Sequence, residues 1–195
     1  MTDRRLVLVD GHGVMYRSFH AIPTLSTSDG RATNAVYGFV RVIRMLRHKL
    51  LPTHMVVVFD GGSPPRRLAL LNSYKAQRPA MPEALRGQFS LAEEYLRLAG
   101  ISCVRIALEE ADDVIATMAD KAEASGGEVL VVTSDKDMYQ LVSERVSVVP
   151  PSDTDRLMTA SDVMAKTGVP PGMMVEWLAL IGDTADNIDG VRGVG

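Results

Sequence analysis

Cysteine is almost absent from this 195-residue chain, which contains only Cys103. A single thiol excludes a framework of intramolecular disulfides, and its apolar neighbours fit a reducing compartment. Long hydrophobic runs are also missing, since none reaches the roughly 20 apolar residues that a membrane-spanning helix needs. The first residues contain no recognisable signal peptide. Together these absences predict a cytoplasmic protein. The hydrophobic fraction of 46% is enough for one sizeable core.

Internal repeats, low-complexity tracts and a dinucleotide-binding fingerprint are absent as well. The glycine-rich GHG at residues 11–13 does not continue into a G-x-G-x-x-G pattern. Charge, in contrast, is present but unevenly spread. Residues 1–105 carry 15 Lys or Arg against 7 Asp or Glu, whereas residues 106–195 carry 6 against 17. This asymmetry suggests a polyanion held by the basic half and metal ions held by the acidic half, although uneven surface charge would look the same.

Short apolar runs alternate with helical patterns along the chain. The five candidate strands are residues 5–10, 54–60, 101–108, 128–135 and 145–149. Apolar residues at spacings of three and four predict helices over residues 35–51, 82–99 and 112–124. The alternation predicts an α/β fold in which a mostly parallel central sheet carries helices on both faces.

Two stretches depart from this alternation. Residues 61–82 are rich in Gly, Pro and cations, which predicts a mobile excursion above the sheet. Residues 182–195 end in GVRGVG, where Gly193 and Gly195 could turn backbone N–H groups toward a phosphate of DNA. We assign both stretches to one predicted domain, residues 1–195.

Carboxylates follow the three clearest strands, which end on Asp10, Asp60 and Asp135. The carboxyl ends of parallel strands lie at one edge of a sheet, where open α/β folds place their sites. The remaining candidates are Glu110, Asp112 and Asp113 at a helix start, Asp137, and Asp183 and Asp186 in the final loop. Oxygen ligands that converge from separate segments suit hard divalent cations, so these acids predict a metal site.

Each acid also has a structural explanation. An aspartate after a strand often caps the next helix, and acids in a first turn favour the helix macrodipole. Capping does not require all three strands to end alike, so the set as a whole favours metal binding. Glu110 and Asp112 lie two residues apart and can share an ion only if Glu110 precedes the helix. So many acids indicate two Mg²⁺ ions acting on a phosphodiester.

Cationic and aromatic side chains in two regions could meet that phosphodiester. The first group lies in the excursion and consists of Arg66, Arg67, Lys75 and Arg78. These cations could clamp a phosphate against the metal ions, or they could form a solvated basic loop. Near the first aspartate, Tyr16 could stack on a terminal base while the guanidinium of Arg17 holds its phosphate.

Several short motifs occur in a fixed order and span nearly the whole chain. They are LVDGHGVMYRSFHA, AVYGF, VVVFDG, YKAQRP, EEADDVIAT, TSDKDMYQLV and IGDTADNIDGVRGVG. With them the chain resembles the 5′-nuclease (5′-3′ exonuclease) domain of bacterial DNA polymerase I, which is related to flap endonucleases and more distantly to PIN-type nucleases. The resemblance implies a PIN-like, resolvase-like fold in which residues 61–82 form an arch over the active site. It also implies metal-dependent cleavage of DNA at 5′ flaps and 5′ ends, as in primer removal and repair.

The resemblance also assigns roles by position. It implies that one Mg²⁺ or Mn²⁺ ion lies among Asp10, Asp60, Glu110, Asp112 and Asp113. It implies that a second lies among Asp135, Asp137, Asp183 and Asp186. Lys75 would contact the scissile phosphate with the help of Arg78. The implied setting is a monomer in the bacterial cytoplasm, near the nucleoid, with a polymerase domain in a longer parent protein.

The sequence departs from the family at its end. In the family, GVRGVG opens a helix-hairpin-helix element that grips duplex DNA and often holds K⁺. Here the sequence stops at the first glycines of that element. All the metal-binding acids are present, so the chemistry remains possible, but we expect a weaker grip on duplex DNA, lower selectivity for junctions and impaired activity.

Two other functions are compatible with the residues. The chain could bind DNA through its basic half without cleaving it, with an affinity that falls as salt rises. A small-molecule phosphohydrolase also uses an aspartate after a strand and Mg²⁺, but no second aspartate lies two residues after Asp10 to support an aspartyl phosphate. Divalent-dependent turnover of DNA would separate a 5′ nuclease from both.

Overall fold

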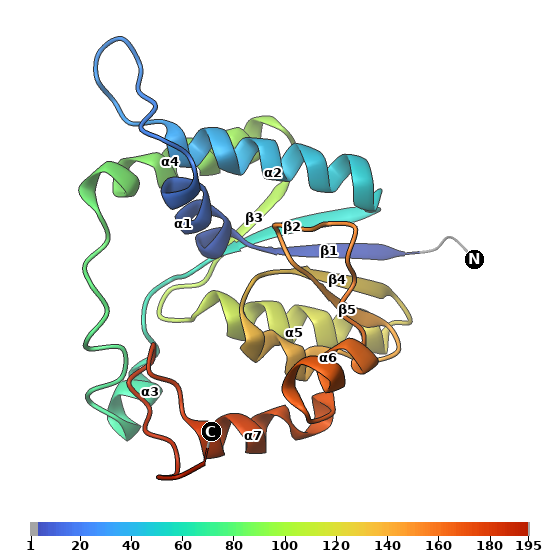
Figure 1. Cartoon of the computed structure of the whole chain (residues 1–195). Coiled ribbons are helices and arrows are strands. Elements are labelled where there is room, and N and C mark those ends of the chain that lie inside the picture. The colour runs from blue at the N-terminus through green and yellow to red at the C-terminus, as the bar shows by residue number, and fades with distance from the viewer. Residues whose placement is uncertain (1–3, 195) are drawn as a thin grey trace.

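The central sheet contains five parallel strands in the order β3-β2-β1-β4-β5. The computed structural model describes residues 4–194 and is shown in Figure 1. The strands are β1 (Arg5–Asp10), β2 (His54–Phe59), β3 (Ser102–Arg105), β4 (Glu128–Val132) and β5 (Val146–Val149). Every strand that the sequence predicts is present, and the pairing is parallel throughout, so the predicted α/β sheet is confirmed.

Helices cover both faces of this sheet. They are α1 (Gly11–Ala21), α2 (Asn34–Leu50), α3 (Pro65–Leu70), α4 (Glu83–Leu98), α5 (Ala111–Ala124), α6 (Ala160–Thr167) and α7 (Met174–Ile181), with 3-10 turns η1 (Lys136–Leu141) and η2 (Pro171–Met173). Figure 1 shows α1, α2 and α4 on one side of the sheet and α5, α6 and α7 on the other. Among the described residues, no helix is long and apolar enough to cross a membrane.

The strand residues divide between two cores because side chains alternate across a strand. Val7 and Val9 of β1 pack under α1, α2 and α4, whereas Leu8, between them, packs under α5. All three are fully buried. A sheet buried on both faces needs nearly continuous apolar strands, which is why these runs were recognisable without a polar alternation.

The predicted boundaries differ from the structure mainly around the acids. β4 ends at Val132, so Asp135 lies three residues beyond the strand rather than at its end. The helix α1, which the sequence analysis did not predict, begins directly after β1 despite Gly11 and Gly13. Its start is fixed because the Asp10 carboxylate accepts a hydrogen bond from the Gly13 N–H at 2.8 Å. Residues 61–82 include α3 and tight turns, and their mobility stays a prediction.

Gly61 is the point where the end of β2 meets the segment before α5. Its N–H donates to the Glu109 carbonyl, and its own carbonyl accepts from Leu108. A Cβ at this position would lie 1.7 Å from the Ile106 carbonyl oxygen, which is backbone and cannot rotate away. The close approach of the two segments therefore depends on glycine, and it sets the position of Asp60, one residue earlier.

We expect Gly61→Ala to lower the free energy of unfolding by about 2–4 kcal/mol, because the two segments must separate. Chemical denaturation measures this change. Gly87→Ala is the matched control: Gly87 lies inside α4 with open space around it, so alanine should stabilise the protein by about 0.5–1 kcal/mol. Equal effects at the two positions would contradict the steric explanation.

Candidate active site

The carboxyl ends of β1, β2 and β4 open into a depression with a volume of about 470 Å³. The acids that the sequence places after these strands meet there with one from the first turn of α5. They are Asp10, Asp60, Asp135 and Asp112. Lys75 and Arg78 line the same depression. The predicted meeting of carboxylates and arch cations at one edge of the sheet is thus present in the structure.

Asp10 lies at the floor of this depression. One of its oxygens accepts from the Gly13 N–H and the other from the Thr133 hydroxyl at 3.1 Å. Thr133 also accepts from the Asp135 N–H, so one threonine connects the ends of β1 and β4. Burial is the main cause that raises the pKa of Asp10 to about 6, and the charges of Asp60 and Asp135 contribute to the same shift. Asp10 is therefore held in place but costly to ionise.

Asp112 is the most strongly perturbed acid of the group. Burial, followed by the neighbouring charges of Asp10, Asp135 and Asp60, raises its pKa to about 8. Asp60 is fixed nearby because its carboxylate accepts from the Ala111 N–H at 2.8 Å. These four acids form what we call the first acidic group: Asp10, Asp60, Asp112 and Asp135.

Asp137 begins a second acidic group on the other side of Asp135. Burial is the main cause that raises its pKa to about 6, and the charges of Asp135, Asp183 and Asp186 contribute to the same shift. Its Oδ1 is buried and has no hydrogen-bond partner. A buried carboxylate oxygen without a partner is costly unless a cation or another donor reaches it. The second acidic group is Asp135, Asp137, Asp183 and Asp186, and Asp135 belongs to both groups.

This donor set fits divalent cations. The oxygens come from separate segments, they raise one another's pKa values, and one of them is an orphaned buried atom. Hard cations such as Mg²⁺ bind such oxygen-only sets and often keep several waters. Within residues 4–194, no three acid, His or Cys side chains are already arranged to hold one ion. Binding therefore requires rotation of these carboxylates, or water between them and the ion.

Glu110 lies just before α5, in extended backbone at the N-cap position. The condition for Glu110 and Asp112 to share an ion is therefore met. The Glu110 carboxylate is buried, however, and faces the arch: it pairs with Arg67, receives the Tyr74 hydroxyl at 3.0 Å, and lies 2.8 Å from Lys75 Nζ. Glu110 thus holds the arch cations against the first acidic group, and its role as a metal ligand stays a prediction.

The remaining arch cations are also paired with acids. Arg66 makes two hydrogen bonds to Glu109, at 2.9 and 3.0 Å, and Arg67 reaches Asp113 at 3.0 Å. Arg66 and Arg67 must therefore exchange acidic partners for phosphates in order to bind DNA. Their DNA-binding role, and the role of Asp113 as a metal ligand, stay predictions.

Arg78 and Lys75 contact the second acidic group through Asp186. Arg78 Nη2 lies 2.5 Å from the Asp186 carboxylate, and Lys75 Nζ lies 3.8 Å from it. Since Lys75 also pairs with Glu110, its ammonium lies between the acids before α5 and those of the final loop. This is the position from which a cation could reach a phosphate held by both groups.

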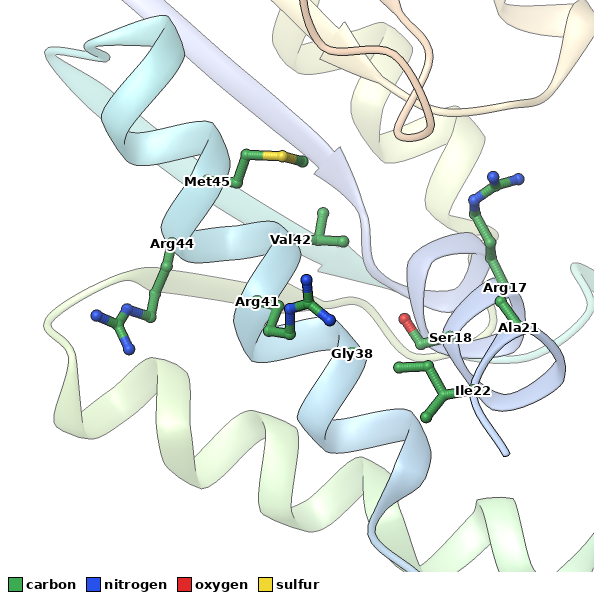
Figure 2. Close-up of a pocket in the computed structure, with 9 residues that line it drawn as sticks. All are labelled: Arg17, Ser18, Ala21, Ile22, Gly38, Arg41, Val42, Arg44 and Met45. Atoms are coloured by element: carbon green, nitrogen blue, oxygen red, sulfur yellow. The ribbon is translucent and has the colours of Figure 1, made fainter. Parts of the chain in front are cut away.

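Tyr16 and Arg17 do not face the same space. Tyr16 lines the depression, where its ring stacks near His12 with centroids 6.5 Å apart. Arg17 lines a separate cavity of about 410 Å³ between α1 and α2, where Arg41 and Arg44 also lie (Figure 2). Successive residues on a helix point about 100° apart, so one nucleotide cannot easily engage both side chains. The role of each side chain in DNA binding stays a prediction. The geometry does not favour the expected arrangement in which Tyr16 stacks on a terminal base while Arg17 holds the phosphate of the same nucleotide.

Some residues of the site had no clear signal in the sequence. Tyr74 and Thr133 bond the acids directly, yet a tyrosine in a basic loop or a threonine after a strand is common. Gly193 adopts a positive φ of 87°, as a turn requires, and its phosphate-binding role stays a prediction. Gly195 lies outside the described residues.

Comparison with known proteins decides the family. The model of the 5′-3′ exonuclease N-terminal resolvase-like domain matches residues 5–168. The chain belongs to this family. It is 44% identical over 192 residues to a 5′-3′ exonuclease of Aquifex aeolicus, covering 98% of this chain and 66% of that protein. It is 43% identical to the thermostable DNA polymerase I of Thermus filiformis, covering 98% of this chain and 23% of that protein. The chain thus spans about two thirds of the first relative and about a quarter of the second.

Solved structures agree with this assignment. A bacteriophage T5 5′-exonuclease with bound zinc has a TM-score of 0.78 and 26% identity, covering 98% of this chain and 72% of that one. A T5 flap endonuclease variant in a pseudo-enzyme-product complex with DNA and metal ions has a TM-score of 0.77 and 26% identity, covering 98% and 71%. The resolvase-like fold of this family is therefore confirmed for the chain.

Proposed function

We propose that this chain is the catalytic part of a structure-specific 5′ nuclease that hydrolyses phosphodiesters at 5′ flaps and 5′ ends of DNA. The observation that carries the proposal is the pair of acidic groups that share Asp135 and lie beside Lys75 and Arg78. Carboxylates alone would repel a phosphate, whereas carboxylates with divalent cations and an adjacent clamp would bind one. The relatives, a 5′-3′ exonuclease and a DNA polymerase I, support the same activity.

Two Mg²⁺ or Mn²⁺ ions fit the two acidic groups. Asp10, Asp60 and Asp112 would hold one, Asp137, Asp183 and Asp186 the other, and Asp135 would serve both. Bound ions would supply a water of lowered pKa and neutralise charge on the attacking and leaving oxygens. The T5 structures, which contain zinc or other metal ions, support a divalent requirement.

The arch cations supply the remaining electrostatics. Lys75 and Arg78 would leave Glu110 and Asp186 for the scissile phosphate, where their charge stabilises the additional negative charge of the transition state. The Tyr16 ring lines the same depression and would stack on the base next to that phosphate. The bound cations would offset the repulsion between the carboxylates, and the phosphate would give Lys75 and Arg78 a new anionic partner.

The setting of the activity extends this proposal. A polymerase domain in a longer parent protein fits the partial coverage of the DNA polymerase I relatives. K⁺ bound at a completed helix-hairpin-helix element, a monomeric state and a bacterial cytoplasmic location complete the proposed context.

We expect this chain to cleave an end-labelled 5′-flap DNA in Mg²⁺ or Mn²⁺ and to show no cleavage in EDTA. Cleavage should be slower at higher salt, because the basic half binds phosphates with release of counterions. Gel electrophoresis of the products measures both effects. A duplex without a flap and a small phosphomonoester are the control substrates. Salt-sensitive DNA binding without turnover would instead identify a binding module, and release of phosphate from the monoester would identify a phosphohydrolase.

A further inference from the structure

The arch is bonded to the final loop over more than its charged side chains. The Lys75 N–H donates to the Asp186 carbonyl at 3.0 Å, and Arg78 Nε donates to the Ala185 carbonyl at 3.2 Å. The Asn187 side-chain amide donates to the Ser73 carbonyl at 3.0 Å. Figure 1 shows the C-terminal loop beside the α3 end of the arch. The Gln77 side-chain amide also donates to the Thr184 carbonyl, and we call these bonds between residues 73–78 and 184–187 the clasp.

Lys75 adopts a backbone conformation that its own sequence does not favour. Its φ is 56°, in the left-handed region, which non-glycine residues such as lysine enter rarely. Such a conformation persists only where the surrounding structure determines it. The clasp supplies that determination, because it bonds the Lys75 N–H itself and the carbonyl of Ser73, two residues earlier.

Asn187 is the side chain of the final loop that donates to the backbone of the arch. It directly follows Asp186 and also has a left-handed φ of 60°, which asparagine tolerates well. The loop that carries it is closed by two backbone hydrogen bonds between Asp183 and Ile188, each 2.8 Å long. Asn187 is thus a fixed donor on a closed loop, directed at the backbone that presents Lys75.

We infer that Asn187 is a positioning residue for Lys75: by holding the Ser73 carbonyl it keeps the Lys75 ammonium between the two acidic groups. The inference rests on the proposed function and extends it to a residue without direct contact to substrate. It makes the arch and the second acidic group one unit, so that a displacement of the final loop moves Lys75 as well.

The test compares Asn187→Gly and Asn187→Asp with the wild-type chain. Glycine keeps the left-handed backbone and removes the donor, whereas aspartate keeps the size and replaces the donor by an acceptor. The first measurement is hydrogen exchange of residues 74–78 in the chain without DNA. We expect hydrogen exchange of residues 74–78 to be at least about tenfold faster in both variants, with unchanged exchange in the strands.

The control is Asp189→Asn, a change at an exposed residue of the same region, which should leave the exchange of residues 74–78 unaltered. Unchanged exchange at 74–78 in the Asn187 variants would overturn the clasp.

The second measurement is the cleavage rate at saturating 5′-flap DNA. We expect Asn187→Gly to lower it about tenfold with little change in DNA affinity, but less than about twofold when Lys75 is already methionine, because the two residues act as a unit. The same loss in both backgrounds would mean a merely structural role and would overturn the inference. A wild-type chain that cleaves no DNA would refute the proposed function, while the exchange result would still decide whether Asn187 holds the arch.

Discussion

Replacing Asp135 by asparagine is expected to reduce cleavage of 5′-flap DNA by roughly 10²–10³-fold, since it removes a charge that both acidic groups share. Asp135 contributes to the raised pKa values of Asp10, Asp112 and Asp137 alike, and so lies close to all of them. Asparagine keeps the carbonyl oxygen that caps η1, where Asp135 accepts from the Asp137 N–H at 2.9 Å. The variant therefore isolates the loss of charge from a loss of local structure.

Single-turnover cleavage and DNA affinity together test this expectation. Affinity should change by less than about threefold, because the phosphate contacts of the basic half remain. Asp120→Asn is the matched control: Asp120 is exposed on α5, about 12 Å along the helix from Asp112, and should retain full activity. An Asp135→Asn protein that cleaves at nearly the wild-type rate would place the chemistry elsewhere in the molecule.

The strands and the three longest helices could be predicted because their apolar periodicity is clear in the sequence. Buried parallel strands leave continuous apolar runs, and α2, α4 and α5 begin and end within about two residues of their predicted bounds. Helix α1 was not predictable in this way. Its first turn contains two glycines, and what fixes it is the Asp10 cap, which depends on the position of β1 in the sheet.

The site could be predicted only in outline. Convergence of the acids followed from parallel topology, since strand ends share an edge. Which acid faces which partner did not follow, because Glu110 pairs with Lys75, more than 30 residues away in the sequence, and Asp186 pairs with Arg78, more than 100 residues away. Nor could the sequence indicate that the adjacent Tyr16 and Arg17 line different cavities, since that depends on the rotation of α1 against α2. Side-chain pairing of this kind is decided by tertiary packing and not by spacing in the sequence.

Replacing Asp112 by asparagine is expected to stabilise the metal-free protein at alkaline pH, on the order of 3 kcal/mol at pH 9. The pKa of Asp112 is about 8 in the folded protein, against an ordinary value of 3.8. Between these values the folded state holds a proton that the unfolded state has released, so the wild-type free energy of unfolding falls as pH rises. Each pKa unit is worth about 1.4 kcal/mol, and relaxation of the acidic group recovers part of the total.

Urea denaturation in EDTA at pH 5 and pH 9 measures the difference. At pH 5 only about one of the roughly four pH units between 3.8 and 8 has been crossed, so the difference between the variant and the wild type should be about a third of that at pH 9, on the order of 1 kcal/mol. Asp120→Asn should show no such pH dependence, because that carboxylate is exposed. Added Mg²⁺ should raise the free energy of unfolding of the wild type more than that of the Asp112 variant, since a bound cation stabilises the ionised carboxylates and offsets the repulsion between them. A wild-type stability that is flat from pH 5 to pH 9 would mean that these acids do not oppose one another in the fold. The argument for a cation-dependent centre would then lose its electrostatic basis.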